Sequence, residues 1–126
     1  MVPVDKLVGL VVAIYQLFAA HNLQVAVWGH AGDGHLHVQP MLDLASVGDR
    51  QKVFKILEDY YSLILSLGGS TTGQHGDGRL RAPFLERLYG PEAYELFKAV
   101  KNVFDPLGIL NPGVKVGVTL DDIKPL

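Results

Sequence analysis

The sequence of 126 residues contains no cysteine, and its basic residues are few. The absence of cysteine excludes disulfides, thiolate metal sites, cysteine nucleophiles and an iron–sulfur cluster held by this segment, and it fits a cytosolic protein. Lys and Arg together number 11, against 13 Asp and Glu, so the net charge is −2. Arg79 and Arg81 are the only close arginine pair, which excludes the basic stripe typical of a nucleic-acid surface.

Long hydrophobic runs are absent as well. The most apolar stretch, Leu7 to Ala20, has 14 residues and includes a glycine, a tyrosine and a glutamine. A transmembrane helix needs about 20 apolar residues, and one acid and one base precede this stretch in place of a basic leader. Its large apolar residues recur with the spacing of an amphipathic helix. We therefore expect a buried helix here.

What is present is the composition of an ordinary globular protein, with 48% hydrophobic and 19% charged residues. We expect a single α+β domain over residues 1–126, with an antiparallel hairpin or small sheet packed on helices and a helical C-terminal segment. The predicted helices cover residues 4–20, a stretch after Ser46 that ends at Leu67, residues 82–89, and residues 91–104. The last has an apolar face of Leu96, Phe97, Val100, Val103 and Phe104.

Two local signals refine these predictions. Ser46 and Asp49 resemble a capping box at the start of the second helix, with Asp in place of the usual Glu or Gln. Gly68 can take the left-handed position that ends this helix. Because a hairpin of two strands is marginal alone, we expect its sheet to continue with strands from another segment or another chain. The exposed sheet edge also makes a homo-oligomer plausible.

The hairpin over residues 25–40 concentrates three of the five histidines. A two-residue turn at Asp33-Gly34 would place His30 opposite His37, and a turn one residue earlier would place His30 opposite His35. Both registers give the same two faces, because side chains alternate along a strand. The apolar face carries Val25, Val27, Ala31, Leu36 and Val38. The other face carries Trp28, His30, His35, His37 and Gln39.

Histidines on one strand face have two interpretations. Opposed residues in a ladder have Cβ atoms about 5 Å apart, a separation at which two imidazoles can share a metal ion. His30, His35 and His37 would then suit zinc or another divalent transition metal such as manganese. The alternative is a solvated polar face.

A second informative stretch is rich in glycine, with five glycines between Gly68 and Gly78. The phosphate-loop motif fails, because Gln74 and His75 follow Gly73 where that motif requires lysine, and the dinucleotide fingerprint also fails. His75 lies among the glycines as a candidate general base. The alternative is an exposed loop histidine without a catalytic role.

Three motifs together resemble one family. GHAGDGHLHVQP (29–40), GGSTTGQHGDGRLR (68–81) and FDPLGILNPG (104–113), in this order and spacing, resemble the C-terminal part of the FAD-linked oxidases. These flavoenzymes include D-lactate dehydrogenases, the glycolate oxidase flavoprotein subunit and D-2-hydroxyglutarate dehydrogenase. The resemblance implies a partial ferredoxin-like cap domain, a C-terminal fragment without the FAD-binding domain.

The resemblance also implies roles for individual residues. His30 and His37 match histidines that bind a divalent ion in metal-dependent members, and His75 matches the base that takes the substrate's hydroxyl proton. Asn111 matches the asparagine that approaches the flavin. Arg79 or Arg81 are candidates, from their chemistry alone, to pair with a substrate carboxylate.

Two residues depart from the family pattern in ways that bear on the metal. Gln74 replaces the glutamate that serves as third metal ligand, and an amide lacks the charge that helps to hold a cation. His35 replaces a common asparagine, so it either supplies a ligand or is a spectator.

The expected function is therefore the substrate side of an FAD-dependent dehydrogenase that oxidises a small D-2-hydroxy acid such as lactate, glycolate or 2-hydroxyglutarate. The expected partners are an N-terminal FAD-binding domain of the same chain and an iron–sulfur electron-transfer protein. No nucleic acid is expected. The alternative is a histidine-based metal-binding or oligomerisation module without catalytic activity.

Overall fold

The computed structural model describes residues 1–123, and the chain divides into two compact units, Met1–Ser70 and Thr71–Leu126. We name them unit 1 and unit 2. The regular elements among the described residues are helices and one antiparallel sheet of two strands, so the predicted α+β class is confirmed. No helix among residues 1–123 combines the length and hydropathy that crossing a membrane requires. That the chain is one domain of a longer protein stays a prediction.

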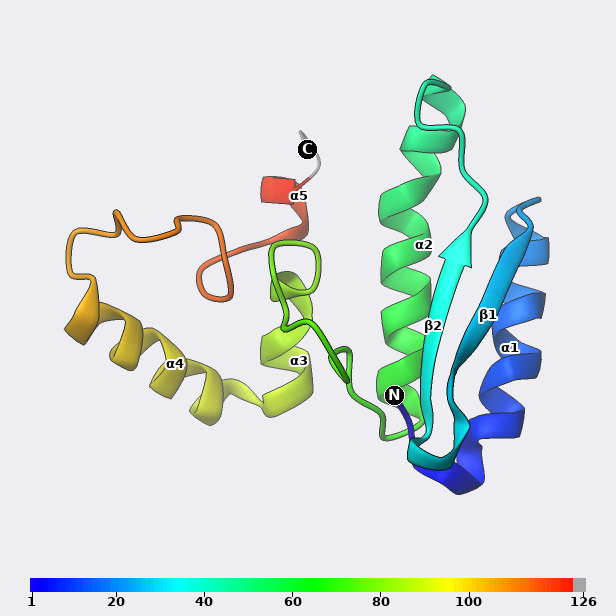
Figure 1. The fold of residues 1–126 in the computed structure, drawn as a ribbon. Helices are drawn as coiled ribbons and strands as arrows, with labels where there is room; N and C mark the ends of the chain where they lie inside the picture. Colours follow the sequence, from blue (N-terminus) through cyan, green and yellow to red (C-terminus); the bar gives the residue numbers. More distant parts are fainter. Residues whose placement is uncertain (124–126) are drawn as a thin grey trace. The chain divides into compact units, whose positions relative to one another are not determined.

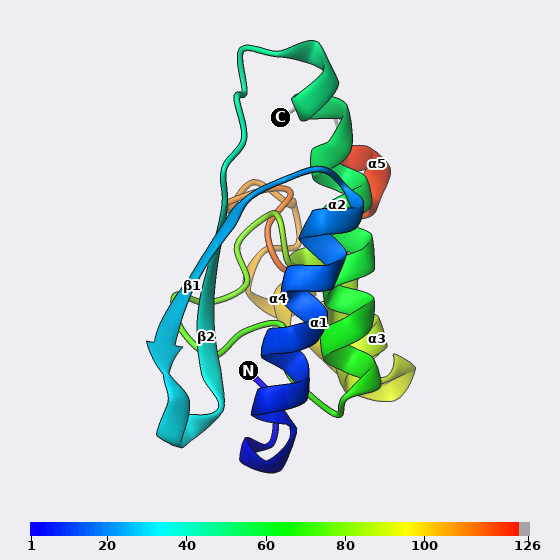
Figure 2. The ribbon, with the colours of Figure 1, turned by 90° about the vertical axis from the view of Figure 1, so that its right-hand side faces the viewer.

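Unit 1 has two layers (Figures 1 and 2). A short 3-10 turn, Val4–Lys6, leads into helix α1, Leu7–Ala20, and helix α2 spans Val47–Ser66. The two helices form one layer, and strands β1, Val25–His30, and β2, His35–Pro40, form the other. The buried core between them consists of Val2, Leu10, Ile14, Phe18, Ile56 and Ile64. This arrangement confirms that the Leu7–Ala20 stretch is a helix with a buried face.

Both helices of unit 1 end in a Schellman motif. At the end of α1, Asn22 takes a left-handed conformation with φ 56°, and the Leu23 N–H donates to the Phe18 carbonyl at 3.0 Å. At the end of α2, Gly68 takes φ 70°, and the Gly69 N–H donates to the Ile64 carbonyl at 2.9 Å. Ends of this kind satisfy the last carbonyls of a helix. The predicted stop at Gly68 is thus confirmed.

The start of α2 differs from the prediction. Ser46 is the N-cap residue, but its side chain makes no capping hydrogen bond. The Asp49 carboxylate accepts the Asp43 N–H at 3.1 Å and pairs with Lys52 Nζ at 3.1 Å. The predicted capping box is therefore wrong, because the connection before the helix competes for the Asp49 carboxylate.

The hairpin connection is longer than the two-residue turn at Asp33-Gly34. A 3-10 turn, Ala31–Asp33, precedes Gly34, which is left-handed with φ 63°. The register pairs His30 with His35 and Trp28 with His37. The pairing of His30 with His37 is therefore wrong, and the alternative pairing is confirmed. The pairing partner of His30 shifts by two positions, so the paired residues keep their predicted faces. Ala31, predicted on the apolar strand face, lies instead in the 3-10 turn and is exposed, because the connection is longer than expected.

Gly34 explains the position of this connection. Its carbonyl accepts the Val2 N–H at 2.9 Å, and a Cβ at this position would lie 2.0 Å from the Val2 carbonyl oxygen. Only glycine allows the N-terminal segment to approach the turn so closely. The apolar hairpin face, including Val27, Leu36 and Val38, packs against the core of unit 1.

Unit 2 contains a short 3-10 turn, Ala82–Phe84, and helices α3, Leu85–Tyr89, α4, Pro91–Phe104, and α5, Leu120–Ile123 (Figure 1). Within unit 2, Tyr94 is the buried residue of α4, and its hydroxyl accepts the Gly117 N–H at 3.1 Å. Phe97 meets Tyr89 edge to face, with ring centroids 5.3 Å apart. The helix α5 was not predicted.

The predicted apolar face of α4 is only partly buried within the described residues. Phe97 is half-buried, but four other members of that face are exposed. Their exposed fractions are 63% for Leu96, 52% for Val100, 75% for Val103 and 78% for Phe104. The sequence predicts this apolar face without saying what covers it, and within unit 2 the contacts of α4 are made by Tyr94 and Phe97.

Candidate functional site

The three histidines of the hairpin gather on one face of unit 1. Because His30 and His35 are opposed in the ladder and His37 follows two residues later, their rings lie side by side. The ring centroids are 5.8 Å apart for His30 and His35, 4.9 Å for His35 and His37, and 5.7 Å for His30 and His37. Trp28 stacks on His37 at 5.6 Å. His30 is exposed, His37 is half-buried and His35 is buried.

The orientation of these rings gives no support to a metal centre. Imidazole ligands must aim one nitrogen each at a common point. The rings of His30 and His35 stack instead, and the ring of His37 meets both edge to face. Within residues 1–123, no group of three or more His, Cys, Asp and Glu side chains could hold a metal ion. The arrangement therefore gives no support to the predicted zinc or manganese site at His30, His35, His37 and Gln74.

Residues 71–78 of the glycine-rich stretch lie in unit 2, and His75 among them is exposed. The backbone of His75 is left-handed, with φ 65°, and Gly76 follows with φ 69°. A residue with a Cβ is uncommon in this conformation, and the conformation costs on the order of 1 kcal/mol or more. Strain of this kind persists only where neighbouring groups hold it in place.

The two arginines that follow the loop have different surroundings. Arg81 Nη1 donates to the carbonyl oxygens of Gln74, at 2.9 Å, and Gly76, at 2.7 Å. These are the carbonyls of the residues before and after His75. Arg79 is exposed, and its Nη1 would lie 4.0 Å from a Cβ added at Gly113. Arg79 is thus the more available of the two for a substrate carboxylate.

Asp77 ties the loop to the C-terminal tail. Its side chain is only 6% exposed and accepts hydrogen bonds from Thr72 Oγ1 and, at 2.7 Å, from Lys115 Nζ. Burial acts to raise the pKa of Asp77, but the hydrogen bonds from Lys115 and Thr72 and the nearby positive charges outweigh it and lower the pKa below 3.8. Asp77 is therefore an ionised anchor at neutral pH.

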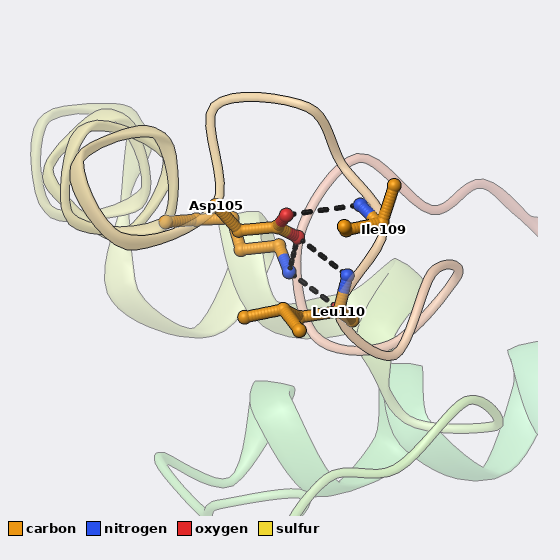
Figure 3. A network of polar contacts seen from close by, with 4 residues as sticks. Asp105, Ile109 and Leu110 are labelled. Carbon is orange, nitrogen blue, oxygen red and sulfur yellow. Dashed lines mark hydrogen bonds and ion pairs between the residues drawn. The ribbon is translucent and has the colours of Figure 1, made fainter.

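The tail that carries Asn111 is held by a second acid (Figure 3). The buried Asp105 carboxylate accepts the N–H groups of Ile109 and Leu110 at 2.9 Å each and pairs with Lys101. These bonds lower the pKa of Asp105, the hydrogen bond from Lys101 first. Asn111 is exposed and left-handed, with φ 49°. Its amide is thus presented on a tightly anchored turn.

The partners Thr72, Asp77, Arg81 and Lys115 were not predicted to act together. Asp77 and Lys115 are 38 residues apart, and no local pattern in one sequence identifies such a pair. A usable signal is the spacing of Arg81 from the loop, since a long donor side chain beside a glycine-rich turn can reach its carbonyls.

Comparison with known proteins identifies the family. Residues 1–114 match the profile of the family described as FAD linked oxidases, C-terminal domain. The chain is 36% identical to the glycolate oxidase subunit GlcD of Bacillus subtilis over 112 residues, which is 89% of this chain and 24% of that protein. It is 39% identical to the D-lactate dehydrogenase of Archaeoglobus fulgidus over 98 residues, which is 78% of this chain and 21% of that protein.

A third relative extends the match along the chain. The D-2-hydroxyglutarate dehydrogenase of Haemophilus influenzae is 36% identical over 121 residues, which is 95% of this chain and 12% of that protein. The chain thus spans a quarter or less of the length of these curated relatives. The family profile covers most of the sequence, including the hairpin, the glycine-rich loop and the Asn111 turn. The chain belongs to the FAD-linked oxidase family and corresponds to its C-terminal domain.

Proposed function

We propose that this chain forms the substrate side of an FAD-dependent dehydrogenase that oxidises a small D-2-hydroxy acid. The observation that carries the proposal is the left-handed backbone of His75 in a chain of this family. Arg81 holds this backbone through hydrogen bonds to the carbonyls on either side of His75. Lactate, glycolate and 2-hydroxyglutarate, named in the relatives, all carry a hydroxyl group next to a carboxylate. We propose the same chemical class for this chain.

The reaction requires a base and a binding group for the carboxylate. In the proposed reaction, the His75 imidazole takes the hydroxyl proton while the α-carbon loses its hydrogen as hydride, and a 2-oxo acid forms. Bound FAD supplies the hydride acceptor. Arg79 is available to pair with the carboxylate. The hairpin geometry gives no support to a metal centre, so no step of the proposed reaction uses a metal.

The chain's contribution to flavin binding is small in this proposal. The exposed Asn111 amide, on a turn anchored by Asp105, fits an approach to the edge of the flavin ring. The main binding site would belong to a separate FAD-binding domain. Electron transfer onward, to an iron–sulfur partner, would need groups that this segment lacks, since it has no cysteine.

The exposed apolar residues of α4 and of the tail that follows it support a contact with such a domain. We name these residues together the α4 apolar face. It consists of Leu96, Val100, Val103, Phe104, Leu107, Ile109 and Leu110, each at least half exposed. Leu96, Val100 and Val103 follow helical spacing and so share one face of α4, and exposed apolar side chains gathered on one face are typical of an interaction site. The relatives have at least three quarters of their length outside the match, and the profile is that of a C-terminal domain. We therefore assign the face to the FAD-binding domain.

The test uses the native flavoprotein that contains this chain. Its flavin absorbance is recorded anaerobically after addition of D-lactate, glycolate or D-2-hydroxyglutarate, with L-lactate as the matched control. Bleaching by one of the three acids, and not by the control, is the expected result. Bound flavin that none of the three acids reduces would overturn the proposed substrate class. Absence of flavin would overturn the dehydrogenase proposal and favour the alternative, a histidine-based metal-binding or oligomerisation module.

A further inference from the structure

The loop around His75 has an unusual backbone that needs an explanation. His75 and Gly76 are both left-handed, with φ values of 65° and 69°. Glycine tolerates this conformation, but His75 has a Cβ and so is strained there. The conformation turns the chain sharply at His75 and leaves this residue exposed. A free loop would relax to the ordinary region of backbone conformation.

Arg81 makes a first set of contacts that hold the loop. One nitrogen of its guanidinium donates to both the Gln74 and the Gly76 carbonyls, at 2.9 and 2.7 Å. These two carbonyls point to one donor only while the residue between them is sharply turned. Hydrogen bonds from an ionised donor are about twice as strong as neutral ones. The Arg81 side chain thus favours the left-handed conformation of His75.

Asp77 makes a second set of contacts that hold the loop. Its buried carboxylate receives Thr72 Oγ1 from the start of the loop and Lys115 Nζ from the tail. Lys115 is itself left-handed, with φ 70°, and its Nζ lies 5.7 Å from the centroid of the Phe97 ring. The tail that presents Asn111 is therefore joined to the loop that presents His75 through one ion pair.

We infer that Arg81 and the Asp77–Lys115 pair are positioning residues, which hold His75 in its left-handed conformation and in register with the tail. This inference rests on the proposed function only in the statement that the positioned His75 is the base. The hydrogen bonds account for Arg81 without a substrate contact. A base displaced by about 1 Å can lose about 100-fold in rate.

The structural part is tested on the 126-residue chain by backbone NMR. Arg81→Met should shift the amide signals of residues 74–77 and speed their hydrogen exchange, while the β1–β2 amides stay unchanged. Arg81→Lys keeps a charged donor and should restore the signals in part. Arg79→Met is the matched control and should leave the loop signals in place. If Arg81→Met leaves the amide signals and exchange rates of residues 74–77 unaltered, Arg81 does not hold the loop.

Lys115→Met provides a second variant that leaves Arg81 intact. It should also move the loop signals, and far-ultraviolet circular dichroism verifies that both variants keep their helices. Movement of the loop in neither variant, in chains that are folded, would overturn the inference.

The catalytic part is tested in the native flavoprotein. Arg81→Met should lower kcat by about 100-fold with KM within a few-fold of the original, and Arg81→Lys should recover part of that loss. A large rise in KM with unchanged kcat would overturn the positioning role and indicate that Arg81 contacts the substrate.

If His75→Ala keeps full activity, the proposed base is wrong. The effect of Arg81 on the loop, measured by NMR, would then still stand as a structural finding.

Discussion

His30 and His35 face each other across the β1–β2 ladder, and their rings stack with centroids 5.8 Å apart. His37 completes the cluster at 4.9 Å from His35. A shared ion would need these imidazoles to aim at a common point, but two of the observed rings stack and the third meets both edge to face. The cluster therefore resembles a small aromatic surface, extended by Trp28, more than a ligand set.

From this geometry we predict that the chain's stability is independent of divalent metal. A site filled at about 100 times its dissociation constant would stabilise the fold by about 2.7 kcal/mol. Thermal unfolding followed by the fluorescence of Trp28, the sole tryptophan, should give the same midpoint with zinc, with manganese and with a chelator. A zinc-dependent rise of several degrees that His37→Ala abolishes would contradict this.

Gly34 should tolerate no side chain, whereas Gly32 should. A Cβ at Gly34 would lie 2.0 Å from the Val2 carbonyl oxygen, and the backbone is left-handed there, but nothing lies within 4 Å of a Cβ at Gly32. We expect Gly34→Ala to lower the free energy of unfolding by about 2 kcal/mol or more and Gly32→Ala to change it by less than about 1 kcal/mol. Urea unfolding followed by Trp28 fluorescence measures both. Equal midpoints for the two variants would refute the close approach of Val2.

Much of unit 1 could be predicted because its signals are local. The apolar spacing that buries Leu10, Ile14 and Phe18 is a property of one helix, and the alternation that separates Val27 from Trp28 is a property of one strand. The hairpin turn was harder to predict. Its conformation depends on Val2, which is more than 30 residues away in sequence and donates to the Gly34 carbonyl. Turn propensity alone therefore favoured a two-residue turn, which is shorter than the observed connection.

Unit 2 was less predictable because its decisive contacts are remote. The sequence identified His75 and Asn111 by resemblance, and nothing in it joined Asp77 to Lys115. Helix α4 shows a related difficulty. A hydrophobic periodicity identifies an apolar face but does not say what covers it, and Val103 and Phe104 of that face are exposed.

Substituting His75 should separate stability from activity. His75→Gly removes the Cβ that strains the left-handed backbone, and His75→Ala keeps it. Both lose the imidazole, so we expect both to lose activity and the glycine variant to be the more stable by about 1 kcal/mol. Urea denaturation of the chain, followed by circular dichroism, gives the comparison. An alanine variant at least as stable as the glycine variant would contradict the strain at His75.

The α4 apolar face should be needed for association and not for folding. Val103 and Phe104 are 75% and 78% exposed, so Val103→Asp and Phe104→Lys should change the stability of the chain by less than about 0.5 kcal/mol. The same changes should weaken binding to a separately produced FAD-binding domain, measured by calorimetry. Ile64→Asp, in the core of unit 1, is the contrasting variant and should unfold that unit. Self-association of the chain that the surface variants abolish, without any effect on the flavin domain, would assign the face to a second copy.

The turn that carries Asn111 should loosen in acid through Asp105. Because the folded-state pKa of Asp105 lies below its ordinary value of 3.8, the unfolded state binds the proton more readily. The stabilisation is therefore complete above about pH 3.8 and is lost as the pH falls through the lower folded-state pKa. The amide protons of Ile109 and Leu110 report this directly, since both donate to the carboxylate. Their NMR shifts should titrate together with a midpoint below 3.8, and Asp105→Asn should remove the titration and speed their exchange at neutral pH. A midpoint above 3.8 would mean that these hydrogen bonds do not hold the turn.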